Sequence, residues 1–329
     1  MKKALLYSIF ALSIASTTLT SCEDIFGGFL DKQPSNELTG EQVFSDWNLT
    51  VQFHLDTYNF LRHGAGRIST TWLDAATDLA ETSYGNGVRT SFNIGNFYGG
   101  SGASELVDTW EHYYRGIRKC NMLLTRIEEV PQNPADSEDK YNRDKKNYIA
   151  EARFLRAYFY WELFLRYGPI PIVTEVLDPD GDLMSKYTIR PTTKEYVVDF
   201  ILEELKSCED DLLDYKTAWT SSSAGRIGQP MACALRSRIM LFMASPRYSS
   251  ESGITWQQAA NVAKEFIDNY GTNFALFNDK DATGATLGIE NYTNALLRTA
   301  YQGSNKEVIF YRNDDKQNWG NIKNDTPVG

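Results

Sequence analysis

The side chains best suited to hold a ligand lie in one long irregular segment, residues 62–102. Aromatic rings alternate there with carboxylate, amide and guanidinium groups. Aromatic faces stack on sugar rings, while charged and amide groups hydrogen-bond to hydroxyls, so this mixture suits recognition of a polar ligand. The alternative is that the aromatic residues only anchor a long loop. The candidate ligand contacts are Trp72, Asp78, Tyr84, Arg89, Phe97 and Tyr98, with Trp319 from a second polar stretch.

The rest of the sequence offers little for catalysis or for metal binding. The three histidines show no HExxH spacing and pair with no cysteine at zinc-binding distances. The run 178–182 resembles a calcium loop, but it lacks the glycine at position 6 and the glutamate at position 12. No nucleophile stands in a specific pattern with a base. We therefore expect neither an enzyme nor a metal or cofactor, and a hydrolase ranks third among the functions considered.

The first 22 residues predict a covalent modification. Lys2 and Lys3 precede a mostly apolar run, Ala4–Ala15, with the length of a signal-peptide hydrophobic region. Interrupting serines and threonines argue against a membrane-spanning helix. Small residues lead up to Cys22, a pattern that resembles a bacterial lipobox, in which the cysteine is acylated. We expect residues 1–21 to be a lipoprotein signal peptide and Cys22 to carry the lipid. An ordinary secretory signal is the alternative.

Composition predicts an exported globular body. Hydrophobic residues make up 42% of the 329, enough for a sizeable core. The net charge of −10 weighs against a nucleic acid partner. Beyond Cys22, the cysteines Cys120, Cys208 and Cys233 are odd in number and lack CxxC spacing. They fall on apolar helical phases, so we expect free buried thiols.

The elements that position these residues are predicted to be helices. Apolar residues between Leu106 and Ile127 recur at steps of four and three, the period of an amphipathic helix. Residues 138–167 form a further helix whose second half is apolar nearly all round, and it should be central. Capping boxes start three others, at Thr39, Thr192 and Thr255. The prediction is an all-α fold: a tetratricopeptide-like helical-repeat scaffold with long irregular loops.

The same spacing predicts which residues are buried and which are exposed. His54 should border the buried stripe of the first helix, while His112 and the acidic run 208–211 should be solvated. A fifth helix should cover 229–244, and one strand should cover Glu307–Tyr311. The predicted buried stripes include Phe44, Trp47, Val51, Leu55, Tyr58 and Leu61; Trp110, Tyr113, Ile117 and Cys120; Val197, Ile201, Leu205, Cys208 and Leu212; and Ala232, Leu235, Ile239 and Phe242.

Several segments together resemble the SusD/RagB family of outer-membrane lipoproteins of the Bacteroidetes type. The resemblance implies a tetratricopeptide-like scaffold, display at the cell surface, and capture of oligosaccharide or polysaccharide for a SusC-like TonB-dependent transporter. The family's ligand contacts follow no fixed motif, so none is transferred to this chain. The matching segments are Leu19–Cys22, Phe29–Pro34, Thr39–Phe44, Trp110–Pro131, Glu151–Pro171 (the most specific), Ala234–Arg238 and Asn305–Phe310.

The resemblance also implies a domain division. We expect a helical SusD-like N-terminal domain over residues 22–225 and the beginning of the family's C-terminal region over 226–329. Family members continue well past the segment Asn305–Phe310, so this chain is expected to be C-terminally truncated. The alternative function is a helical-repeat adaptor, anchored to the outer membrane, that binds another protein.

Overall fold

The computed structural model divides the chain into two units, Met1–Val43 and Phe44–Gly329. In the first unit the description begins at Thr39, and α3 (Gly40–Phe44) starts there with the predicted capping box. The backbone nitrogen of Thr39 donates to Gln42 Oε1 at 2.8 Å, and the nitrogen of Gln42 donates to Thr39 Oγ1 at 3.3 Å. The structure describes residues 39–62, 77–78, 94–95, 104–178, 180–182, 187–218, 220, 223–297 and 305–311.

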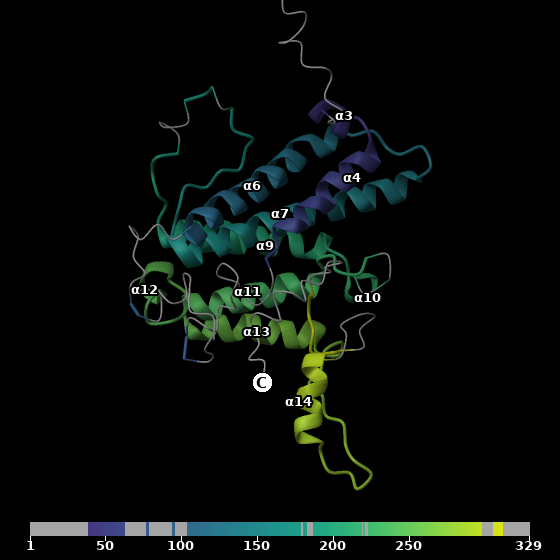
Figure 1. Cartoon of the computed structure of the whole chain (residues 1–329), viewed down its shortest axis with the longest axis vertical. Coiled ribbons are helices and arrows are strands. Elements are labelled where there is room, and N and C mark those ends of the chain that lie inside the picture. The colour runs from purple at the N-terminus through teal and green to yellow at the C-terminus, as the bar shows by residue number, and fades with distance from the viewer. Residues whose placement is uncertain are drawn as a thin grey trace, which may run out of the picture. The chain divides into compact units, whose positions relative to one another are not determined.

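The described part of the second unit is helical and contains no strand, which confirms the all-α prediction. Long helices that are near one another along the chain pair: Figure 1 shows α6 beside α7 and α11 beside α13, with α9 contacting both α7 and α11. Its elements are α4 (Trp47–Asp56), η1 (Thr57–Phe60), α6 (Ser104–Arg126), η3 (Ile127–Glu129), α7 (Glu138–Tyr167), the π-helix η4 (Lys194–Leu202), α9 (Glu203–Cys208), η5 (Glu209–Asp211), α10 (Tyr215–Ala218), α11 (Gln229–Met243), α12 (Ser249–Ser252), α13 (Trp256–Tyr270) and α14 (Gly288–Leu297).

Helix α7 is central, as its composition predicted. Its C-terminal half is buried on nearly every face, and Phe154, Leu155 and Phe159 are fully buried. Helix α6 approaches it closely because Gly116 has no side chain: a Cβ there would lie 2.7 Å from Cε2 of Phe159. Gly168 ends α7 with a φ of 67°, a conformation that favours glycine.

Three stripe residues predicted to be buried are substantially exposed: Leu55 (40%), Trp110 (38%) and Phe242 (40%). For Leu55 the reason is a break in the first helix, because Asp46 accepts a hydrogen bond from Leu49 N at 2.9 Å and restarts the helix in a new phase. Trp110 and Phe242 instead lie at the margin of the core, where they pack edge-on against other aromatic rings.

The C-terminal prediction was wrong in two respects. Residues Glu307–Tyr311 form turns and irregular backbone rather than a strand. The neighbouring carbonyl of Lys306 accepts from Ala275 N at 3.2 Å. The helix α14 was not predicted.

The three described cysteines confirm the prediction of free thiols. Cys120, Cys208 and Cys233 are all buried and unpaired with one another. Burial raises the pKa of the Cys120 thiol to about 12, so it remains protonated and unreactive at neutral pH. None of the helices in the described ranges has both the length and the apolar character needed to cross a membrane.

Candidate functional site

The predicted ligand-binding segment lies almost wholly outside the described residues. Of its members only Asp78 is described, and it is exposed in a bend. The proposed lipid attachment point Cys22 also lies outside the described ranges. These positions therefore remain predictions: Trp72, Tyr84, Arg89, Phe97, Tyr98 and Trp319.

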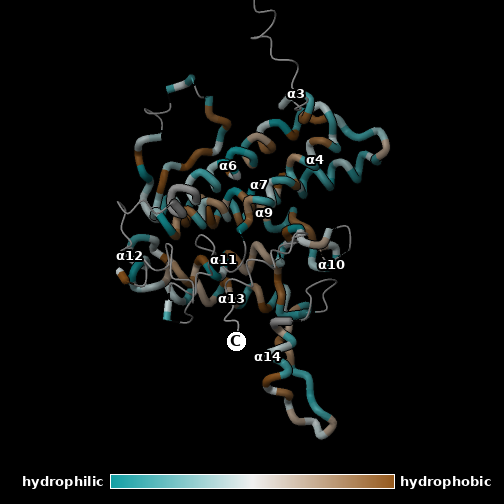
Figure 2. Tube along the Cα trace, in the orientation of Figure 1, coloured by the Kyte–Doolittle hydropathy of each residue, from teal (hydrophilic) through white to brown (hydrophobic). Residues whose placement is uncertain are grey.

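A cleft of about 470 Å³ is formed by the segments that leave α7 and enter η4. This connection is the teal loop at the upper left of Figure 1, and Figure 2 shows that hydrophobic stretches alternate with polar ones along it. The cleft is therefore wide enough for a small ligand and has mixed polarity. Its lining residues are Pro171, Ile172, Thr174, Glu175, Tyr187, Ile189, Pro191 and Glu195.

The segment that leaves α7 forms the first wall of the cleft. Two tyrosines of the helical body hold the backbone of this wall. The Tyr114 hydroxyl donates to the carbonyl of Pro171 at 2.9 Å. The Tyr160 hydroxyl donates to the carbonyl of Val173 at 3.0 Å and accepts from the nitrogen of Val173 at 2.7 Å. An extended segment without sheet partners thus has its polar backbone groups satisfied by side chains.

Asn121 on α6 also holds this wall of the cleft in place. Its Nδ2 donates to the carbonyls of Val173 and Glu175, each at 3.0 Å. Its Oδ1 accepts from Arg156 Nη1 at 2.9 Å, and Arg156 Nη2 lies 2.6 Å from Glu204 Oε2. Asn121, Arg156 and Glu204 are all buried. A buried ion pair therefore orients the amide that positions the wall of the cleft.

The segment that enters η4 forms the second wall of the cleft, and it contains the predicted capping box. Glu195 Oε2 accepts hydrogen bonds from the backbone nitrogen and the hydroxyl of Thr192, at 2.8 and 2.9 Å. These bonds lower the pKa of Glu195 below its usual value, so the carboxylate is charged at neutral pH. Between the walls, the Tyr187 hydroxyl donates to Glu175 Oε1, which ties the only aromatic ring among the described lining residues to a carboxylate.

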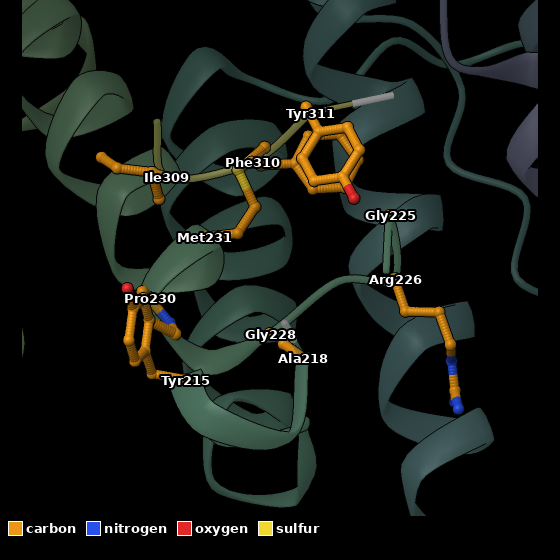
Figure 3. A pocket seen from close by; sticks show the side chains of 10 residues that line it. All are labelled: Tyr215, Ala218, Gly225, Arg226, Gly228, Pro230, Met231, Ile309, Phe310 and Tyr311. Carbon is orange, nitrogen blue, oxygen red and sulfur yellow. The ribbon is translucent and has the colours of Figure 1, made fainter. Parts of the chain in front are cut away.

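Residues near Phe310 line two further pockets. One has a free volume of about 10 Å³, which is room for no more than about one water molecule. Figure 3 shows its lining, with the guanidinium of Arg226 pointing away from the aromatic rings of Phe310 and Tyr311. The other has about 210 Å³ and is lined by Leu55, Tyr58 and Phe310 among others. Neither matches the cleft in size.

One group of potential metal ligands is present among the described residues, but its chemistry does not fit a metal. Glu209, Cys233 and Glu265 offer ligand atoms within 4.8 Å of one another. Arg236 occupies both carboxylates: its Nη1 pairs with Glu209, and its Nη2 lies 3.1 Å from Glu265 Oε2. Burial raises the pKa of Cys233 to about 12, whereas metal binding requires the thiolate. The prediction that Glu209 is solvated was wrong, because this ion pair holds it inside the protein.

The predictions for His54 and His112 had different outcomes. His54 is buried next to the apolar face of α4, as expected. His112 is half-buried rather than set among surface charges, and its Nε2 lies 2.9 Å from the carbonyl of Phe60.

A family model described as starch-binding and associated with the outer membrane matches residues 28–241, more than half of the chain. The chain belongs to the SusD-like family. A curated relative, SusD-like protein P38 of Formosa agariphila, is 24% identical over 228 residues. That match covers 68% of this chain and 41% of the relative, so this SusD-like chain spans about two fifths of the relative's length.

Solved structures show the same fold. A SusD-like protein from Bacteroides fragilis NCTC 9343 has a TM-score of 0.56 and 24% identity, covering 86% of this chain and 48% of its own. A laminarin-binding SusD-like protein has a TM-score of 0.56 and 20% identity, covering 79% and 50%. Identities this low establish the SusD-like fold and nothing further.

Sequence reasoning missed the cleft of this SusD-like chain. Its key residues, Glu175, Tyr187 and Glu195, lie twelve and eight residues apart and form no motif. The available signal was the isolated Asn121 and Arg156 on otherwise apolar helix faces, because buried polar side chains must have partners.

Proposed function

We propose that this protein is a surface-exposed, non-catalytic lipoprotein that captures oligosaccharides and delivers them to a SusC-like TonB-dependent transporter of the outer membrane. Membership of the SusD-like family, with its description as starch-binding, supports this function. So does the laminarin binding named for one protein of the same fold. The observation that carries the proposal is the cleft with Tyr187 tied to Glu175.

The chemistry of the cleft suits a sugar chain. The ring of Tyr187 offers a face for stacking, and fixing its hydroxyl removes rotational freedom before the ligand arrives. The carboxylates of Glu175 and Glu195 are acceptors for sugar hydroxyls, and Thr174 supplies a hydroxyl of its own. We propose that the segment Thr71–Tyr98, with Trp319, adds further aromatic contacts.

A glycan array tests the proposed binding. The folded protein should be retained by at least one oligosaccharide class, and single sugars should bind far more weakly because they span only part of the site. Tyr292→Ala is the matched control, since Tyr292 is an exposed tyrosine on α14 outside the cleft. If the control variant still binds that oligosaccharide and Tyr187→Ala does not, binding is placed in the cleft.

Anchoring is tested separately. We propose that residues 1–21 are removed and that Cys22 carries the lipid, followed by a helical domain over 22–225 and the beginning of the family's C-terminal region over 226–329. Cys22→Ala should move the protein from the membrane fraction to the soluble fraction and abolish labelling with a radioactive fatty acid. Unchanged membrane association would refute the anchor and leave glycan binding untouched.

A second candidate function is a protein-binding adaptor, and one observation favours it. Helix α13 presents an exposed stripe in which Trp256 (56% exposed) and Ile267 (66%) flank Ala260 and Ala263 at helical spacing. A folded protein that binds no glycan on the array would favour this function.

A further inference from the structure

We infer that Arg156 of α7 is a positioning residue for the cleft, because its guanidinium ties the helix that begins at the second wall to the amide that holds the first wall. The inference rests on the proposed function, since it concerns binding in the same cleft. Arg156 is buried and is not among the lining residues. It acts through Asn121, so that the two walls keep one arrangement before a ligand arrives.

On one side, Arg156 is fixed to the helix of the second wall. Its Nε and Nη2 both donate to Oε2 of Glu204, at 3.2 and 2.6 Å. Its guanidinium carbon lies 5.9 Å from the centre of the ring of Phe200. Phe200 belongs to η4, whose first turn carries Glu195 of the second wall, and α9 with Glu204 follows η4 without a break. The guanidinium is therefore held by the helix that starts at this wall.

On the other side, Arg156 determines which way the amide of Asn121 points. Its Nη1 donates to Asn121 Oδ1 at 2.9 Å. An arginine can only donate hydrogen bonds, so it binds the oxygen of the amide and leaves Nδ2 for the carbonyls of Val173 and Glu175. In the reversed orientation the amide oxygen would face two carbonyl oxygens, and its nitrogen would face a guanidinium. Arg156 therefore selects the orientation of Asn121 that holds the first wall.

Arg153, one turn earlier on α7, offers a matched comparison. Its Nε and Nη2 donate to the other carboxylate oxygen, Oε1 of Glu204, at 3.2 and 2.9 Å. Both arginines thus bind the same carboxylate through the same two nitrogens, and Arg156 differs in using Nη1 to reach Asn121. A lysine at either position keeps the positive charge beside Glu204, but its single ammonium group lacks the planar fork that spans two partners.

Tyr160 keeps the two walls in place when Arg156 is changed. Its hydroxyl forms two hydrogen bonds with the backbone of Val173, at 3.0 and 2.7 Å. Its carbonyl accepts from the hydroxyl of Tyr196, on η4, at 3.1 Å. A substitution at Arg156 therefore loosens the first wall near Glu175 without releasing it. We expect a folded variant with weakened binding.

Calorimetric titration of an array-selected oligosaccharide tests this role with matched substitutions. Arg156→Lys should weaken binding at least about fivefold, on the order of one lost hydrogen bond, whereas Arg153→Lys should change the affinity by less than about twofold. Asn121→Ala should weaken binding as well. Because Arg156 acts through Asn121, adding Arg156→Lys to Asn121→Ala should change the affinity by no more than about twofold. An arginine with a structural role alone would lower the stability in both backgrounds and leave the affinity of the folded protein unchanged.

The possible outcomes separate this inference from the proposed function. Equal affinities of folded Arg156→Lys and Arg153→Lys, or independent losses that multiply in the double variant, would overturn the positioning role and leave glycan binding intact. A folded parent protein that binds no glycan on the array would overturn the proposed function and this inference together. Circular dichroism melting curves confirm that each variant is folded. If Arg156→Lys does not fold, Glu204→Gln takes its place, because it keeps the arginine, removes the charge that fixes it, and should weaken binding to the same degree.

Discussion

The Nε2 atom of His54 lies 2.8 Å from Oε2 of Glu151, and both side chains are almost completely buried. The second carboxylate oxygen of Glu151 lies 2.6 Å from Nη2 of Arg226. One carboxylate on α7 therefore joins α4 to the turn that leads into α11. Tyr58 completes the group by accepting from the backbone nitrogen of Ile227 at 3.1 Å. We interpret this cluster as structural, because it ties distant segments together inside the core.

Removing the charge of Glu151 should strongly destabilise the protein. Glu151→Gln leaves the half-buried guanidinium of Arg226 without its ion-pair partner, and breaking a buried pair of this kind costs about 3–5 kcal/mol. Urea denaturation measures the free energy of unfolding. Glu111→Gln is the control, since Glu111 forms an exposed pair with Arg115 at 3.8 Å and should change stability by less than about 0.5 kcal/mol. Equal effects of the two substitutions would contradict the structural importance of the cluster.

The same cluster predicts a pH dependence. Burial alone would raise the pKa of Glu151, but Arg226, His54 and Tyr58 outweigh burial and lower it. A lowered pKa in the folded state contributes stability above the unfolded value of about 4.3, and this contribution disappears as the pH falls through the lowered pKa. The urea concentration at the unfolding midpoint should therefore decrease as the pH is lowered below about 4.3, and it should decrease less steeply for Glu151→Gln. Parallel curves for the two proteins would show that another group is responsible.

Asn121 should act as a positioning residue for the cleft. Asn121→Asp keeps the acceptor for Arg156 but removes the amide that donates to the carbonyls of Val173 and Glu175. Losing these two hydrogen bonds costs about 0.5–1.5 kcal/mol each, and glycan affinity should fall as the wall loosens, although the carbonyl of Val173 keeps its bond from the Tyr160 hydroxyl. Asn269→Asp, on the exposed surface of α13, makes the same chemical change without these contacts. Calorimetric titration at a temperature well below both melting transitions separates lost affinity from lost folding, and unchanged affinity in Asn121→Asp would contradict the role.

Two leucines of α7 test its central place in the core. Leu155 is fully buried, whereas Leu165, ten residues later on the same helix, is exposed. Leu155→Ala should lower the free energy of unfolding by about 2–5 kcal/mol, because it removes buried methyl groups and leaves a cavity. Leu165→Ala should have little effect. Thermal unfolding followed by circular dichroism checks both, and a parent-like melting temperature for Leu155→Ala would mean that α7 is peripheral.

The sequence predicted those structural features that depend on residues close together along the chain. The capping boxes at Thr192 and Thr255 were recognisable because cap and partner lie three residues apart, and the apolar half of α7 was recognisable from its composition. The break at Asp46 was missed because a capping side chain restarts a helix without any change in apolar content. The π-helix η4 has the same apolar pattern as an α-helix and was also missed.

The cleft could not be predicted, because it depends on contacts between distant segments. Asn121 on α6 reaches the backbone of Val173 and Glu175, and no spacing along the chain reveals that partnership. Tyr187 gains its role only when the loop folds back so that its hydroxyl meets Glu175. Of the ligand contacts that the sequence did single out, Asp78 alone lies among the described residues.

The most direct test of the account is a calorimetric titration of an array-selected oligosaccharide into the parent protein, Tyr187→Ala and Tyr292→Ala. Stacking of a ligand ring on an aromatic side chain contributes on the order of 1–3 kcal/mol to binding. Tyr187→Ala should therefore weaken binding by at least about fivefold. Tyr292→Ala should bind like the parent protein. Equal affinities for all three folded proteins would show that the cleft between α7 and η4 is not the glycan-binding site.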